Sequence, residues 1–140
     1  MQKVTINIPL DPRTKKNSQR IATNRITGKQ FIVPSQDFKQ YERDAMFFVN
    51  RFSRLNINEP VNVQCLFYMR TRRVCDLTNL LEAIDDILVA AGVLADDNYK
   101  IVAGHDGSRV LFDKENPRTE IIITPIASER AKIDASTQRV

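Results

Sequence analysis

Residues 77–91 constrain the fold of this chain more than any other segment. Their apolar side chains recur at helical spacing, because each residue advances by about 100° around a helix axis. Asn79, Glu82 and Asp86 fall together on the opposite face. The apolar stripe consists of Leu77, Leu80, Leu81, Ile84, Ile87, Leu88 and Ala91. We therefore expect a helix that ends near Gly92 and buries one side against a larger structure.

Strands are predicted where apolar and polar residues alternate. Residues 3–8 and 61–69 show this period of two, and residues 120–126 should form the last strand. Shorter extended segments are expected at 101–103 and 109–112. These segments provide a sheet on which the helical stripe can pack.

A second helix and a hairpin are predicted between the first two long strands. Ser35 is a good N-cap for a helix over residues 36–52, whose apolar residues again recur at helical spacing. Residues 21–26 and 31–33 should form a hairpin that turns through Thr27-Gly28-Lys29.

The sequence predicts an α+β fold, with a mixed β-sheet and two main helices packed on it. We expect a single domain over residues 1–126 and a polar C-terminal tail over 127–140. The start of the chain lacks a long apolar run, which predicts neither a signal peptide nor a membrane span. Cys65 and Cys75 have no metal-site spacing, so we expect reduced thiols and a cytoplasmic protein.

The charge is unevenly distributed along the chain. Residues 1–73 hold 14 Lys and Arg against 5 Asp and Glu, whereas residues 74–126 hold 4 against 10. A basic half indicates a polyanionic partner, and a bound divalent cation would reconcile it with the acidic half. Ordinary solvated surface is an equally good interpretation of the charges alone.

Three carboxylates flank the helix predicted at 77–91. Asp76 precedes it, and Asp96 and Asp97 follow it. They could hold Mg²⁺ or Mn²⁺, which prefer oxygen ligands, but the spacing alone favours an N-cap at Asp76 and a solvated turn at Asp96-Asp97. A helix of this length spans about 21–23 Å, so Asp76 and Asp97 can meet only if the chain doubles back.

Three sequence elements resemble the RusA family of Holliday-junction resolvases, many of them phage-encoded. Ile8-Pro9 followed by Lys15-Lys16-Asn17-Ser18 is similar to the family's proline-bounded N-terminal segment. Asp76-Leu77-Thr78-Asn79 is similar to its D-x-D-N helix start, and Gly92 followed by Asp96-Asp97 to its later Gly-then-Asp-Asp element. The resemblance extends over most of the predicted domain and implies a RusA-like fold.

The resemblance implies catalytic roles for Asp76 and Asp97, and a Mg²⁺ site (Mn²⁺ as a substitute) at Asp76, Asp96, Asp97 and Thr78. Two positions depart from the family pattern: Thr78 replaces an aspartate, and Glu82 replaces the catalytic lysine. Our hypothesis is that Glu82 supplies the missing carboxylate as a third catalytic residue. A solvated helix residue is the alternative for Glu82.

Basic residues in two segments are candidates for DNA contact, and Asn17 in the first of these segments is a further candidate. The predicted DNA-binding residues are Lys15, Lys16, Asn17 and Arg20, with Arg70, Arg72 and Arg73. We interpret His105 as an exposed turn residue and Asp85 as a surface or inter-subunit residue. The aromatic residues expected in the core are Phe31, Phe38, Phe47, Phe48 and Phe67.

The family resemblance implies a metal-dependent endodeoxyribonuclease that resolves Holliday junctions by paired phosphodiester cuts. Its partners would be four-way or other branched DNA and, since two symmetric cuts suit two equivalent sites, a second copy in a homodimer. A nuclease for flaps or forks, a catalytically weakened branched-DNA-binding protein and a protein that does not bind DNA remain alternatives.

Overall fold

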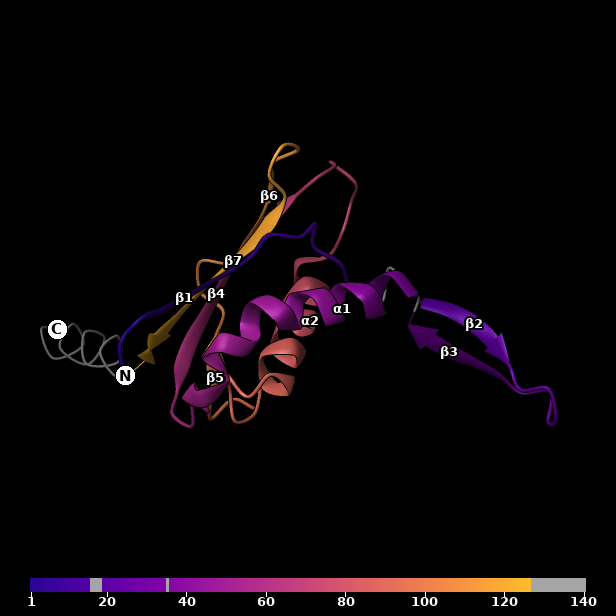
Figure 1. The fold of residues 1–140 in the computed structure, drawn as a ribbon, viewed down its shortest axis with the longest axis horizontal. Helices are drawn as coiled ribbons and strands as arrows, with labels where there is room; N and C mark the ends of the chain where they lie inside the picture. The colour runs from indigo at the N-terminus through magenta and orange to yellow at the C-terminus, as the bar shows by residue number, and fades with distance from the viewer. Residues whose placement is uncertain (16–18, 35, 127–140) are drawn as a thin grey trace, which may run out of the picture.

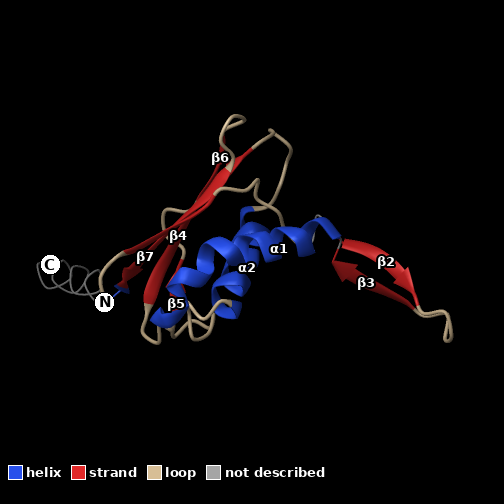
Figure 2. Cartoon of the chain, viewed as in Figure 1, coloured by secondary structure: helices blue, strands red, loops and turns tan. Residues whose placement is uncertain are grey.

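Two helices pack against one face of a mixed sheet, which confirms the predicted α+β class (Figures 1 and 2). The computed structural model describes residues 1–15, 19–34 and 36–126. The predicted tail at 127–140 lies outside these residues. In the described part of the chain, no helix has both the length and the apolar character needed to cross a bilayer.

The sheet has the strand order β1-β7-β4-β5, with β6 also paired to β4. β7 lies between β1 and β4 and is antiparallel to both, whereas β5 and β6 run parallel to β4 along the same edge. The strands are β1 (Val4–Ile8), β4 (Val61–Met69), β5 (Val102–Gly104), β6 (Arg109–Phe112) and β7 (Arg118–Pro125).

Alternation within the strands gives the sheet one buried face. Val63, Cys65 and Phe67 of β4 are at most 1% exposed and lie beside Ile121 and Ile123 of β7. The apolar stripe of α2 (Leu77–Ala90) covers this face. The apolar side chains predicted from the strand and helix periods thus pack together in a single core.

Helix α1 (Gln36–Val49) is shorter than predicted, because the chain tightens into the 3-10 helix η2 (Asn50–Leu55). Asn56 ends η2 with a left-handed backbone (φ 38°). The apolar residue Phe52 still packs against the core from η2, which is why its periodicity extended the predicted helix.

The predicted hairpin is present, but its first strand begins and ends earlier in the chain than predicted, and its second is longer. β2 (Gln19–Thr23) pairs with β3 (Gln30–Pro34) in a two-stranded sheet separate from the main one. Figure 1 shows it projecting from the N-terminal end of α1 as an arm. We call residues 19–34 the β2–β3 arm.

Two aromatic residues predicted in the core are outside it. Phe47 is 79% exposed and Phe31 is 48% exposed. Phe38 and Phe67 are buried as expected, and Phe48 is partly buried. Phe47 follows a helical residue that does face the core, so it lies about 100° around α1 from Met46 and outside the buried stripe.

Candidate functional site

Asp76 lies at the N-terminal end of α2 with an exposed carboxylate. It occupies the N-cap position in an extended conformation, but its side chain makes no capping hydrogen bond with the helix backbone. Asp76 Oδ2 instead accepts a hydrogen bond of 3.3 Å from Asn79 Nδ2. The backbone therefore leaves this carboxylate available to another ligand.

Asp96 and Asp97 follow α2 and differ in their surroundings. Asp96 accepts hydrogen bonds from the Asp97 amide (2.7 Å) and from Asn98 Nδ2 (2.9 Å), so it holds its own turn together. The hydrogen bond from the Asp97 amide is the main cause of the lowered pKa of Asp96. The pKa of Asp97 is raised, first by desolvation, then by its hydrogen bond with Asp96 and by the negative charges of Asp86 and Asp96.

After α2 the chain turns back beside the last turn of the helix. The amides of Val93 and Leu94 both donate to the carbonyl of Leu88, at 3.0 and 3.3 Å. This return places Asp97 where the charge of Asp86 acts on it. Asp86 follows Asp76 by ten residues, which is about 15 Å along the helix axis.

The carboxylates of one chain therefore lie along α2 and not in one cluster. Thr78 and Glu82 are exposed on the intervening stretch, and no hydrogen bond or ion pair joins the Glu82 side chain to another described residue. Across residues 1–15, 19–34 and 36–126, no three His, Cys, Asp or Glu side chains are placed to hold a metal ion.

Lys15 connects the basic N-terminal segment to this acidic face. Its Nζ lies 3.1 Å from Asp86 Oδ2, and 5.9 Å from the centre of the Phe38 ring. Both side chains of the ion pair are more than a third exposed, so the pair contributes little to stability. The ion pair does bring the basic N-terminal segment next to the acidic face of α2, although the two are far apart in the sequence.

A cavity of about 330 Å³ opens at the N-terminal end of α2. Its walls come from residues 11–14, 69–71 and 73–75 with Leu80 of α2, and they include Arg13, Arg70 and Arg73. Asp11 fixes the two walls together by accepting a hydrogen bond of 3.0 Å from the Arg70 amide. Two of the predicted DNA-binding residues thus share a cavity with Arg13, which the sequence analysis did not select.

Cys75 lines the same cavity next to Asp76. Burial raises the pKa of the Cys75 thiol, and the charge of Asp76 raises it further. Both effects disfavour the thiolate, which is the nucleophilic form of cysteine.

The other predicted DNA-binding residues have different surroundings or lie outside the described part of the chain. Arg72 lies beside it, with its guanidinium 4.2 Å from the centre of the Phe112 ring. Arg20 belongs to β2 of the arm. Lys16 and Asn17 lie outside the described residues.

A partly buried pair that sequence analysis missed joins α2 to the loop between β5 and β6. Asp85 is 8% exposed, and its Oδ2 lies 2.8 Å from His105 Nε2. The predictions of an exposed His105 and a surface Asp85 are wrong, because the β5–β6 loop folds over the edge of β4 and His105 reaches the Val63 carbonyl (2.8 Å). The available signal was the position of Asp85 beside the apolar stripe.

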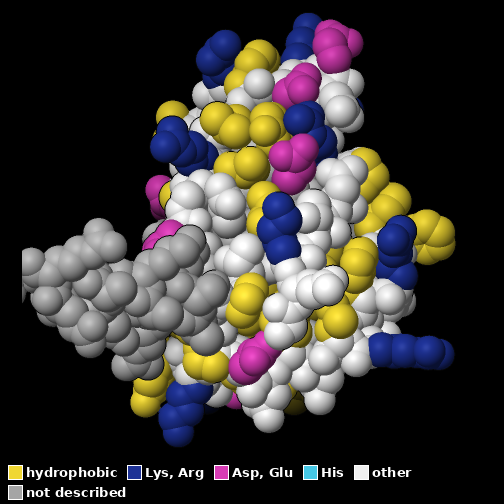
Figure 3. Space-filling model, turned by 90° about the vertical axis from the view of Figure 1, so that its left-hand side faces the viewer, with side chains coloured by type: hydrophobic (Ala, Val, Ile, Leu, Met, Phe, Trp, Pro, Cys, Tyr) yellow, Lys and Arg dark blue, Asp and Glu magenta, His cyan; other side chains and the backbone are white. Residues whose placement is uncertain are grey.

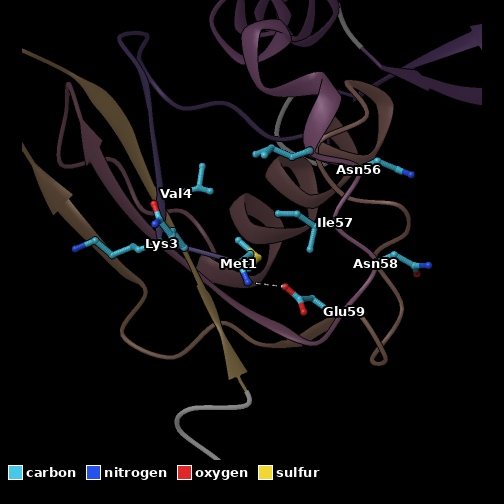
Figure 4. A pocket seen from close by; sticks show the side chains of 9 residues that line it. Met1, Lys3, Val4, Asn56, Ile57, Asn58 and Glu59 are labelled. Carbon is cyan, nitrogen blue, oxygen red and sulfur yellow. Dashed lines mark ion pairs between the residues drawn. The ribbon is translucent and has the colours of Figure 1, made fainter.

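A second cavity and the side of the molecule seen in Figure 3 offer no comparable chemistry. The cavity of about 620 Å³ in Figure 4 lies between the first residues and the segment after η2, where the Met1 amino group pairs with Glu59 at 3.5 Å. In Figure 3, hydrophobic, basic and acidic side chains are intermixed over the visible described surface. The cavity beside Asp76 is therefore the better candidate.

No protein-family model matches this sequence, and no curated protein is significantly similar to it.

Proposed function

We propose that this protein is a structure-specific endodeoxyribonuclease of the RusA type that resolves four-way DNA junctions. The proposal rests on the motif resemblance together with the placement of the candidate residues. The observation that carries it is the cavity at the start of α2, whose lining includes Arg13, Arg70 and Arg73 and ends at Cys75, the residue before the exposed Asp76.

Backbone phosphate is the ligand that suits this cavity. Guanidinium groups bind phosphate oxygens in a bidentate manner, and the N-terminal end of a helix adds a partial positive charge. In the described part of the chain, no ion pair occupies the guanidinium groups of Arg70 and Arg73. A phosphate held here would lie within reach of Asp76.

The carboxylates of one chain do not fit a complete metal site, because Asp76 and the Asp86–Asp97 end of α2 are about three helical turns apart. In the proposed homodimer, two α2 helices that meet antiparallel across a two-fold axis would bring Asp76 of one chain to Asp97 of the other. Such a symmetric contact repeats itself, so it creates two equivalent sites. We propose Mg²⁺, with Mn²⁺ as a substitute, as the ion these combined carboxylates would hold.

Cleavage of a synthetic four-way junction tests the proposal. The full-length protein should cut the junction in symmetric pairs when Mg²⁺ is present and leave a linear duplex of the same sequence intact. Flaps and replication forks belong in the same panel, because a nuclease for those branches would cut them faster. Absence of Mg²⁺-dependent cleavage of every branched substrate would contradict the proposal.

A DNA-binding protein that does not cleave is the second candidate. The separation of the carboxylates in one chain and the substitution of an aspartate by Thr78 favour it. Salt-sensitive binding of the junction without any metal-dependent cleavage would select this candidate.

A further inference from the structure

The β2–β3 arm lies within a stretch that carries positive charge only. Between Asp11 and Asp37 the sequence has no acidic residue, while six basic residues occur. These are Arg13, Lys15, Lys16, Arg20, Arg25 and Lys29. A segment of this length with one sign of charge complements a polyanion.

The described side chains of the arm lie outside the protein's own core. None of its described side chains belongs to the buried cluster, and Ile21 is 69% exposed. Figure 1 shows the arm extending away from the sheet and from both helices. A projecting element with exposed apolar residues is accessible to a partner.

The tip of the arm is held by hydrogen bonds. Asn24 Oδ1 accepts from the amides of Ile26 (2.8 Å) and Thr27 (3.1 Å), and the Asn24 amide donates to the Lys29 carbonyl at 2.8 Å. The Gly28 amide closes the turn by donating to the Asn24 carbonyl at 2.9 Å, with the left-handed backbone (φ +71°) that glycine allows. The tip is therefore preorganised.

This turn presents an apolar side chain to water. Ile26 is 94% exposed and sits between the exposed basic residues Arg25 and Lys29, neither of which pairs with an acidic side chain in the described part of the chain. Apolar side chains flanked by cations are the groups that proteins insert between base steps, because base faces are apolar while the surrounding phosphates are anionic.

The dimensions of the arm fit a nucleic-acid groove. A two-stranded ribbon enters the major groove, which is about 8.5 Å deep. The five-residue strands extend about 17 Å at about 3.3 Å per residue. The tip can therefore reach the base edges while the base of the arm remains outside the groove.

We infer that the β2–β3 arm is a DNA wedge, in which Arg25 and Lys29 bind backbone phosphates while Ile26 enters the base stack at a branch point. The inference rests on the proposed function for its substrate. It adds a contact far from the cavity beside Asp76, and one that needs no metal.

Base unstacking is measured with the full-length protein and a four-way junction that carries 2-aminopurine at the branch point, in EDTA so that no cleavage occurs. The fluorescence should rise several-fold on binding of the wild-type protein, and Ile26→Ser should abolish most of that rise. Ile26→Leu should retain it. Ile21→Ser is the matched control, because it removes an exposed isoleucine from the strand of the same arm and should leave the rise unchanged.

Affinity for the junction should fall about tenfold in Ile26→Ser, because the buried apolar contact is lost. Arg25→Gln combined with Lys29→Gln should weaken binding to junction and linear duplex alike and reduce the salt slope by about two charges. The inference is overturned if Ile26→Ser produces the same rise in 2-aminopurine fluorescence as the wild-type protein. A lower oligomer mass of Ile26→Ser in sedimentation, without DNA, also overturns it, since the tip would then be a subunit contact.

The two proposals fail separately in this design. Unstacking that depends on Ile26 together with no Mg²⁺-dependent cleavage contradicts the nuclease and supports the wedge. Cleavage of the junction with no Ile26-dependent unstacking contradicts the wedge alone.

Discussion

His105 Nε2 lies 2.8 Å from Asp85 Oδ2, and the other ring nitrogen of His105 lies 2.8 Å from the carbonyl oxygen of Val63. Both partners are hydrogen-bond acceptors, so both ring nitrogens must donate. A neutral imidazole has a single N–H, and the arrangement is therefore best satisfied by an imidazolium beside a carboxylate. This pair joins α2 to β4 and to the loop between β5 and β6.

The stability of the protein should depend on the protonation of His105. Its pKa is raised, chiefly by the hydrogen bond to Asp85, whereas the unfolded chain has the ordinary value near 6.5. The pair's contribution to the free energy of unfolding is therefore complete below about pH 6.5 and is lost as the pH rises through the raised pKa. Denaturant unfolding of wild type and His105→Gln should differ by about 1.5–3 kcal/mol at pH 6, and by less at pH 9.

Asp85→Asn provides the control for this pH dependence. It keeps the size of the side chain but removes the carboxylate that raises the pKa of His105. The variant should be destabilised at pH 6, and NMR titration should show a lower His105 pKa. An equal stability difference at pH 6 and pH 9 would show that the pair is not charged in the folded protein.

Asp76→Asn should abolish junction cleavage while the fold and junction binding remain. The amide keeps the hydrogen-bonding shape of the side chain but removes the charge that a metal requires. Binding could even tighten, because a charge that repels phosphate is gone. The measurement is cleavage together with gel-shift affinity, and full activity of the variant would remove Asp76 from the site.

Mixing two inactive variants tests whether the site combines residues of two chains. A heterodimer of Asp76→Asn and Asp97→Asn would contain one site with both substitutions and one site with neither. Cleavage should therefore reappear on mixing, as single nicks and not as paired cuts. If each chain forms its own site, every site retains one substitution and the mixture stays inactive.

Substitutions in the cavity should weaken DNA binding without regard to branching. Arg70→Gln and Arg73→Gln should each lower affinity for junction and duplex, and each should reduce the salt slope by about one charge. Arg54→Gln is a matched control, because η2 meets the opposite end of α2 through the Asn56–Gly92 hydrogen bond. Equal salt slopes in all three variants would place the cavity off the DNA path.

Glu82 and Thr78 should couple if Glu82 replaces the family's second aspartate. Glu82→Gln should then lower cleavage by orders of magnitude, and adding Thr78→Asp should recover a large part of the loss. The two residues are about one helical turn apart, so non-additive effects are expected. Normal cleavage by Glu82→Gln would identify Glu82 as a solvated residue.

The sequence was sufficient to predict a helix or strand wherever the spacing of its apolar residues matched the side that is buried. The stripe of α2 and the alternation in β4 are examples, because the same apolar spacing that identified them also places them in the core. The end of α1 was missed for the same reason: apolar spacing persists through Phe52, although the backbone has changed to a 3-10 helix.

The residues of the candidate site were harder to place because their relations depend on tertiary packing. Helix length gave the span of α2 between Asp76 and the turn after it, but not that the turn at Val93 and Leu94 would bring Asp97 under the influence of Asp86. The contact between His105 and Asp85 joins residues 20 apart and depends on how a loop crosses a strand edge. No periodicity carries that information.

The position of β7 has a consequence for the synthesis of the protein. β7 is the last strand in the described part of the chain, yet it lies between β1 and β4 and provides the only described pairing of β1. A ribosome therefore releases β1 and β4 long before the strand that joins them. Until Arg118–Pro125 emerges, their unpaired edges and the apolar stripe of α2 stay exposed to chaperones and to aggregation.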